Sequence, residues 1–76
     1  MNNKQRQELT LRIPLDRPPT PEDRSNRLGL PEFMEFLFKN GWADESGKAL
    51  KDFTLSQEGH AQGGEYYIEW KAKLHQ

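Results

Sequence analysis

The sequence predicts a small single α+β domain, in which a three-stranded, mainly antiparallel sheet packs on one helix in the order β-α-β-β. Apolar residues alternate with polar ones over 8–16 and again over 65–74, a pattern typical of strands with one buried face. Between these stretches, residues 30–40 carry apolar side chains at helical spacing. A chain of 76 residues holds one such domain, over 1–76, and is too short for a second.

The first strand is expected near the N-terminal end. Every second position there is apolar: Leu9, Leu11, Ile13 and Leu15. Pro14 has no backbone N–H to donate to a neighbouring strand, so we expect this strand at an edge of the sheet. The preceding residues 1–7 are polar, and we expect them to be disordered.

Residues 17–29 are predicted to form a loop rich in proline and arginine. Leu28 is the one large aliphatic residue of this segment, which therefore buries too little surface to offset the entropy of ordering. Thr20 and Pro21 match the cap and the first position of a short helical turn. Loops of this length in small domains are usually functional or disordered, and the sequence leaves open which holds here.

The clearest helix begins at Leu30, with Pro31 in its first turn, and ends at Asn40 and Gly41. On a helical wheel, one stripe contains Leu30, Phe33, Met34, Leu37 and Phe38. We expect this stripe to face the sheet. Phe36 falls outside the stripe and is expected on the exposed flank of the helix.

The C-terminal half is predicted to form a hairpin. Over 49–56, Phe53 and Leu55 could alternate as a strand, although the first half of this stretch could equally form a helical turn; we prefer the strand. Residues 57–64 include several glycines and are expected to be a loop. In the strand over 65–74, the predicted buried face consists of Tyr66, Ile68, Trp70, Ala72 and Leu74.

Composition narrows the class of protein. The net charge of −1 argues against binding nucleic acid through bulk electrostatics. The chain has no cysteine, which excludes disulfides and fits a reducing compartment. No apolar run resembles a signal peptide or reaches the roughly 20 residues that span a bilayer. We therefore expect a cytoplasmic protein without a membrane partner.

No residue pattern predicts an enzyme. His60 and His75 lack a second ligand at metal-binding spacing, and no serine lies in the glycine-flanked turn that presents a nucleophile. The adjacent carboxylates at 22–23 and 44–45 lie in polar segments and are interpreted as capping and solubility residues. We expect no catalytic residue, no metal and no cofactor.

Large aromatic residues outside the predicted core point instead to a partner. Aromatic residues and arginine are enriched at the energetic centres of protein interfaces. The expected partner-binding residues are Phe36, Trp42, Tyr67, Arg12, Arg17, Arg24 and Arg27. Trp42 could instead fold back over the helix end as a hydrophobic cap. Arg17, Arg24 and Arg27 would form a flexible basic arm that becomes ordered on contact.

We therefore expect a small non-enzymatic protein-binding or regulatory protein, an adaptor or inhibitor that docks on a larger assembly. Pairing of an edge strand with a second copy, forming a homodimer, is one form of such binding. The alternative is a weak single-stranded nucleic-acid-binding domain, in which Tyr67 stacks on a base while Arg12, Lys71 and Lys73 contact phosphates. Glu69 on the same face would repel phosphate.

Overall fold

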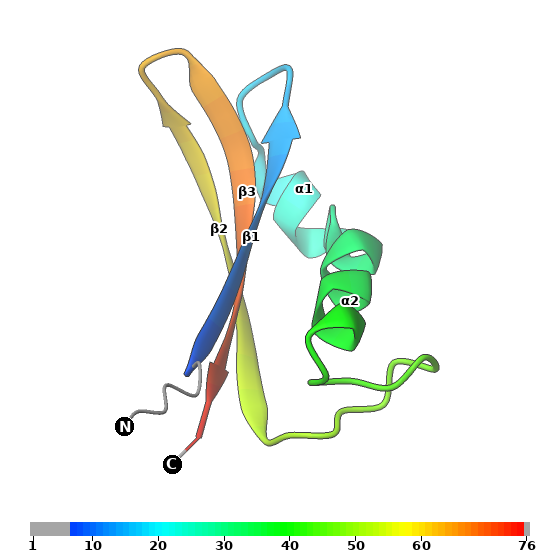
Figure 1. The fold of residues 1–76 in the computed structure, drawn as a ribbon. Helices are drawn as coiled ribbons and strands as arrows, with labels where there is room; N and C mark the ends of the chain where they lie inside the picture. The colour runs from blue at the N-terminus through cyan, green and yellow to red at the C-terminus, as the bar shows by residue number, and fades with distance from the viewer. Residues whose placement is uncertain (1–6, 76) are drawn as a thin grey trace.

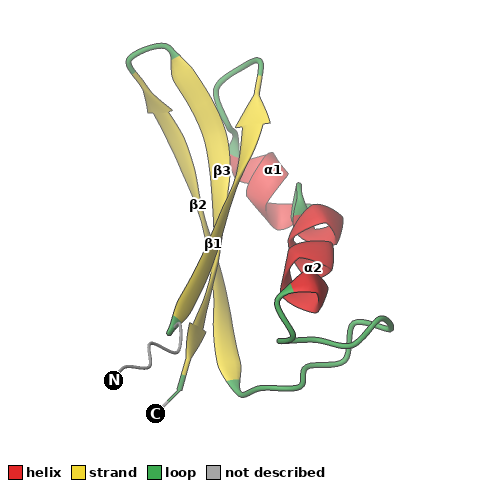
Figure 2. Ribbon diagram, viewed as in Figure 1, coloured by secondary structure: helices red, strands yellow, loops and turns green. Residues whose placement is uncertain are grey.

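The structure, a computed structural model, describes residues 7–75. Its elements are β1 (Glu8–Leu15), α1 (Pro21–Ser25), α2 (Leu30–Lys39), β2 (Phe53–Gln62) and β3 (Glu65–Leu74). The strands form one three-stranded antiparallel sheet in the order β1-β3-β2. Figure 1 shows both helices on the same side of the sheet, and Figure 2 shows the long loop that leads from α2 to β2. The predicted α+β fold is confirmed, with α1 as an additional element.

β1 lies at one edge of the sheet, as its proline predicted. The Leu74 N–H donates to the Gln7 carbonyl oxygen at 2.9 Å, so the odd-numbered residues of β1 hydrogen-bond β3. Pro14 is even-numbered, and an N–H at this position would point away from the sheet. The proline therefore costs no ladder bond. Of the segment 1–7 expected to be disordered, residues 1–6 lie outside the described residues, and Gln7 extends the pairing of β1.

The core lies between α2 and the face of the sheet that the alternation predicted. Phe33 is fully buried and its ring stacks on that of Trp70, with 5.8 Å between the ring centroids. The buried apolar residues are Leu9, Phe33, Leu37, Trp42, Ala43, Ile68, Trp70 and Ala72. Because Phe33 and Trp70 come from the helix and the central strand, their contact sets how α2 is rotated over the sheet.

This rotation corrects the predicted roles of two phenylalanines. Phe38, expected on the buried stripe, is 46% exposed. Phe36, expected on the exposed flank, is half-buried and packs against the core, with its ring centroid 6.1 Å from that of Phe33. The buried stripe is centred on Phe33 and Leu37, which turns Phe36 toward the sheet and Phe38 toward solvent.

The segment 17–29 is not a loop throughout, because α1 forms within it. Thr20 caps the helix: its Oγ1 accepts from the Asp23 N–H at 3.2 Å, and the Asp23 carboxylate accepts from the Thr20 N–H at 2.8 Å. Arg17 donates two further hydrogen bonds to the same carboxylate, at 2.7 and 2.9 Å. Composition predicted a segment that buries too little surface to be ordered. These local polar contacts order α1, which has no buried residue.

The predicted loop at 57–64 is wrong, because β2 continues to Gln62. The preferred strand within 49–56 is present from Phe53 onward. The hairpin turn consists of Gly63 and Gly64, both at positive φ (61° and 82°), as a two-residue turn of type I′ requires. Gly59 lies inside the strand for a packing reason: a Cβ there would come within 3.0 Å of Pro19, which crosses this end of β2.

Candidate functional site

Trp42 does not belong to an exposed partner-binding surface, contrary to its place in the predicted set. Its side chain is 4% exposed and packs against Phe53, with 5.6 Å between the ring centroids. Gly41, at φ 79°, turns the chain back at the helix end, and the Trp42 N–H donates to the Leu37 carbonyl oxygen at 2.9 Å. Trp42 is thus the hydrophobic cap that was the alternative interpretation of this residue.

Tyr67 lies on the open face of the sheet, between Arg12 and His60. The His60 ring stacks on the Tyr67 ring at 4.6 Å between centroids, and the Arg12 guanidinium carbon lies 4.9 Å from the Tyr67 centroid. β1 and β2 flank β3 on opposite sides, so these two groups reach the ring from opposite sides. Both faces of the Tyr67 ring are therefore occupied within the protein itself.

Carboxylates lie at the centre of this open face. The Arg12 Nε is 3.5 Å from a Glu69 carboxylate oxygen. The His60 Nε2 lies 3.2 Å from a Glu58 oxygen and 3.7 Å from the same Glu69 oxygen. Glu58 and Glu69 are direct partners in the register of β2 and β3. The open face is therefore mixed in charge and presents no continuous positive path for a phosphate backbone.

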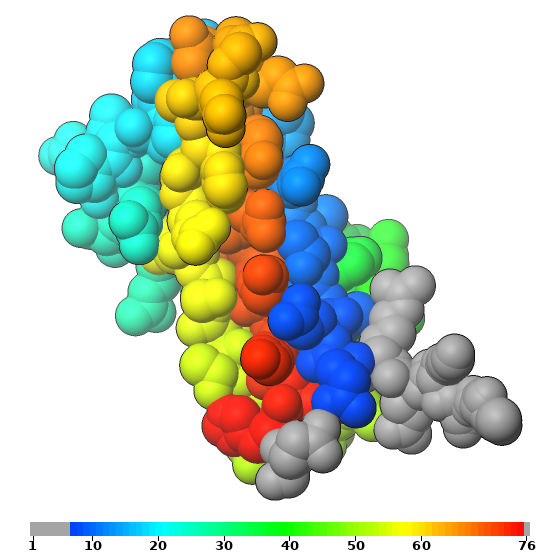
Figure 3. All heavy atoms as spheres, turned by 90° about the vertical axis from the view of Figure 1, so that its left-hand side faces the viewer, coloured from blue at the N-terminus to red at the C-terminus, as the bar shows by residue number. Residues whose placement is uncertain are grey.

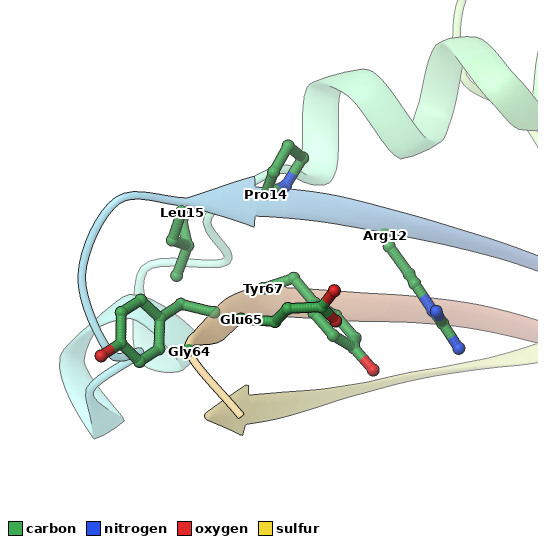
Figure 4. A pocket seen from close by; sticks show the side chains of 7 residues that line it. Arg12, Pro14, Leu15, Gly64, Glu65 and Tyr67 are labelled. Atoms are coloured by element: carbon green, nitrogen blue, oxygen red, sulfur yellow. The ribbon is translucent and has the colours of Figure 1, made fainter. Parts of the chain in front are cut away.

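A hollow of about 430 Å³ lies at the tip of the sheet, where β1 ends and the hairpin turns (Figure 4). Its lining residues are Arg12, Pro14, Leu15, Gly64, Glu65, Tyr66 and Tyr67. Throughout residues 7–75, no polar or charged residue is buried, and no cluster of His, Asp and Glu is arranged to hold a metal ion. This hollow therefore contains no group held in a desolvated position for chemistry.

Two of the predicted basic residues, Arg17 and Arg24, are engaged in contacts with other parts of the chain. The hydrogen bonds from Arg17 hold the pKa of Asp23 well below its usual range, and the same contacts raise the pKa of Arg17. Arg24 donates to the Gln57 carbonyl oxygen at 3.2 Å, while the Gln57 side-chain amide donates to the Arg24 carbonyl oxygen at 2.8 Å. The segment is thus not a free basic arm, because α1 is docked on β2.

The outer edge of β2 offers free backbone groups. The Gln57 carbonyl bonds to Arg24, so it points away from β3, and strand alternation points the N–H and C=O groups of Phe53 and Leu55 in the same direction. No hydrogen bond within residues 7–75 engages these outward groups of Phe53 and Leu55. Figure 3, which views the open face of the sheet, shows β2 at one margin with the α1 segment beside it.

A second hollow, of about 290 Å³, adjoins this edge. Leu55 lies on the core side of the sheet but is 39% exposed; α2 packs on β1 and, through the contact of Phe33 with Trp70, on β3. The hollow is lined by Arg27, Leu30, Leu55, Ser56, Gln57 and Trp70. Its lining is mixed: Leu30, Leu55 and Trp70 are apolar, Ser56 and Gln57 are polar, Arg27 is positively charged, and no carboxylate lines it.

The structure brings Arg24 and Arg27 together around Gln57, on the core side of β2, while Arg12 and Tyr67 lie on the opposite face. Sequence reasoning missed Leu55 as a surface residue. The signal was available, since an edge strand has a neighbour on one side only and its core-facing residues receive less cover. His60 was also missed, because its segment was predicted to be a loop.

No helix among the described residues is long and apolar enough to cross a membrane. Comparison with known protein families gives no match, and neither the curated proteins nor the solved structures include a significant relative of this chain.

Proposed function

We propose that this chain is a small non-enzymatic protein-binding domain, an adaptor or inhibitor, that contacts its partner along the outer edge of β2. The observation that carries this proposal is the set of free N–H and C=O groups at Phe53 and Leu55, beside an open hollow lined in part by Leu30, Leu55 and Trp70. An exposed strand edge is a template for pairing with another chain, and the adjoining hollow receives its side chains.

The helix flank, the first expected docking site, has less support. Phe36 and Trp42 both pack on the core, so neither is free to anchor a partner. The exposed large apolar side chains are Phe38, Leu50 and Leu55. Of these, Leu55 belongs to the stretch of β2 that also has free backbone groups, and single exposed apolar residues elsewhere are ordinary.

The nucleic-acid alternative also has less support. Stacking of a base on Tyr67 requires displacement of His60 or Arg12 from its ring. Glu58 and Glu69 lie beside these groups and repel phosphate. Binding to protein through the β2 edge requires no such rearrangement.

The experiment is capture of partners from a cell lysate with the tagged chain, with and without nuclease. Leu55→Pro removes an N–H that points away from β3, so it blocks the edge without breaking a ladder bond, as Pro14 does on β1. Thr10→Pro makes the matched change on the β1 edge and serves as the control. We expect nuclease-resistant capture that Leu55→Pro abolishes and Thr10→Pro preserves.

Capture that disappears with nuclease would favour the nucleic-acid alternative. Capture that survives nuclease and Leu55→Pro would keep a protein partner but move its site elsewhere. Circular dichroism of both variants would first establish that each retains the fold.

A further inference from the structure

We infer that the β2 edge binds an extended, acidic segment of a partner protein as a fourth strand, and that Arg27 recognises a carboxylate of that segment. This inference rests on the proposed function and specifies the chemistry of the partner.

The geometry limits binding to the first half of β2. At the other end, Pro19 lies over Gly59, and Arg24 occupies the outward carbonyl of Gln57. The outward groups of Phe53 and Leu55 remain free. A strand paired there directs alternate side chains toward the hollow beside Leu55. The segment therefore needs an apolar residue at such a position.

The charges beside the hollow indicate which other residues the partner segment carries. Arg27 lines the hollow, and Arg24 lies one helical turn before it, bonded to a neutral carbonyl oxygen. Neither arginine forms an ion pair within residues 7–75. A segment with a carboxylate beside its apolar residue gains a charge-assisted hydrogen bond, and a basic segment is repelled.

The backbone of Arg27 supports a role for its side chain. Arg27 has a φ of 55° and is the one non-glycine residue at positive φ among residues 7–75. It follows the C-cap of α1: its N–H donates to the Arg24 carbonyl oxygen at 3.1 Å, and the Leu28 N–H donates to the Asp23 carbonyl oxygen at 2.9 Å. Glycine is the usual residue at this position of a helix end. An arginine here holds a strained backbone conformation at a position that lines the hollow, and such strain clusters at binding sites.

The same charge argues against a second copy of the chain as the occupant. A symmetric pair of β2 edges places like surfaces next to each other, since a two-fold axis relates the same residues. The Arg24 and Arg27 side chains of both copies would then lie on one face of the joined sheet, with no carboxylate lining either hollow. An acidic segment neutralises this charge.

The test selects short random peptides, displayed on phage, that bind the wild-type chain. Peptides that also bind the Leu55→Pro variant are then discarded. We expect the enriched peptides to alternate apolar and acidic residues. A synthetic copy of an enriched peptide should bind about tenfold more weakly to Arg27→Gly, because glycine suits the backbone conformation but lacks the charge. Arg27→Lys keeps the charge and should largely retain binding. Thr10→Pro should bind as the wild type does. In amide NMR spectra, the Leu55 N–H should become protected from exchange on binding.

Enrichment without acidic residues, or equal affinity in Arg27→Gly, would overturn the inference. So would concentration-dependent dimerisation that Leu55→Pro abolishes, because the edge would then belong to a second copy. A partner captured from lysate through Leu55 but insensitive to Arg27→Gly would preserve the proposed function while the inference fails. If no protein is captured at all, the proposed function itself fails.

Discussion

The indole Nε1 of Trp70 donates a hydrogen bond to the backbone carbonyl oxygen of Leu28 at 2.8 Å. This bond joins the central strand to the linker between α1 and α2. On the other side of the indole, Phe33 stacks on the ring. Trp70 thereby contacts both the linker and the second helix.

Two substitutions of Trp70 should separate its polar and apolar contributions. Trp70→Phe keeps a ring against Phe33 but leaves the Leu28 carbonyl oxygen without its donor, and should lower the free energy of unfolding by about 1 to 3 kcal/mol. Trp70→Ala also removes the buried ring, and should cost about 3 to 5 kcal/mol. Urea denaturation followed by far-ultraviolet circular dichroism measures both. Equal costs for the two variants would show that the hydrogen bond, rather than the ring, dominates.

The two outer phenylalanines of α2 should differ in their effect on stability. Phe36→Ala removes a half-buried ring that packs on Phe33, and should lower the free energy of unfolding by about 1 to 3 kcal/mol. Phe38→Ala truncates a side chain that is 46% exposed, and should change the free energy of unfolding by less than about 0.5 kcal/mol. Thermal unfolding of the pair checks this. The opposite order would mean that α2 is rotated as the helical wheel predicted.

Arg27→Gly should make the chain more stable. At a φ of 55°, a residue with a Cβ is strained, and glycine relieves this strain, so the free energy of unfolding should rise by about 0.5 to 1 kcal/mol. Arg27→Ala is the control, because it removes the guanidinium and keeps the strain. A comparable gain in Arg27→Ala, measured by the urea midpoint, would attribute the effect to charge instead of backbone.

Acid should destabilise the fold through Asp23. The hydrogen bonds from Arg17 lower the pKa of Asp23 in the folded chain below its ordinary value of 3.8, so the unfolded chain takes up the proton first as the pH falls. Asp23 thus contributes stability above about pH 4, and this contribution is lost as the pH falls further toward the folded pKa. Asp44 acts in the same direction, since its hydrogen bond from the Ser46 hydroxyl lowers its pKa.

Denaturation midpoints measured between neutral and acidic pH check this dependence. Asp23→Asn should flatten the plot of denaturation midpoint against pH at its acidic end, because the remaining pH dependence of stability then comes from Asp44 and the other carboxylates. A curve identical to that of the wild type would show that the Arg17 contact does not persist in solution.

Much of the fold follows from local patterns. The alternation from Leu9 to Leu15 and over 65–74 predicted two strands and their buried faces, because a single covered face imposes a period of two. Pro14 predicted the edge. Pro31 and Gly41 predicted the limits of α2, because backbone restrictions act at single residues.

The predictions that were wrong depend on tertiary contacts. Residues 57–62 have no apolar alternation: Gly59 leaves room for Pro19 on one face, and His60 stacks on Tyr67 on the other. Pairing with β3 makes them a strand. A helical wheel gives the width of the apolar stripe on α2 but not its rotation, which the contact of Phe33 with Trp70 sets. Trp42 was expected at the surface because the sequence does not show the return of the chain toward Phe53.

The candidate site was less predictable than the fold. Arg24 and Arg27 were identified as partner-binding residues, but as parts of a flexible arm, and Leu55 was not identified. Their grouping depends on α1 docking on Gln57, a contact between residues 33 positions apart. Distant pairings of this kind leave no periodic trace in a single sequence.

The place of Pro14 also limits how large an assembly this sheet can build. The β1 edge lacks an N–H at Pro14 and carries the charged Arg12 side chain, so it is a poor template for a further chain. Copies of a chain can pair edge to edge in an open-ended series only if both margins of the sheet accept a strand. The asymmetry of the two margins therefore disfavours the growth of copies of this chain into fibrils.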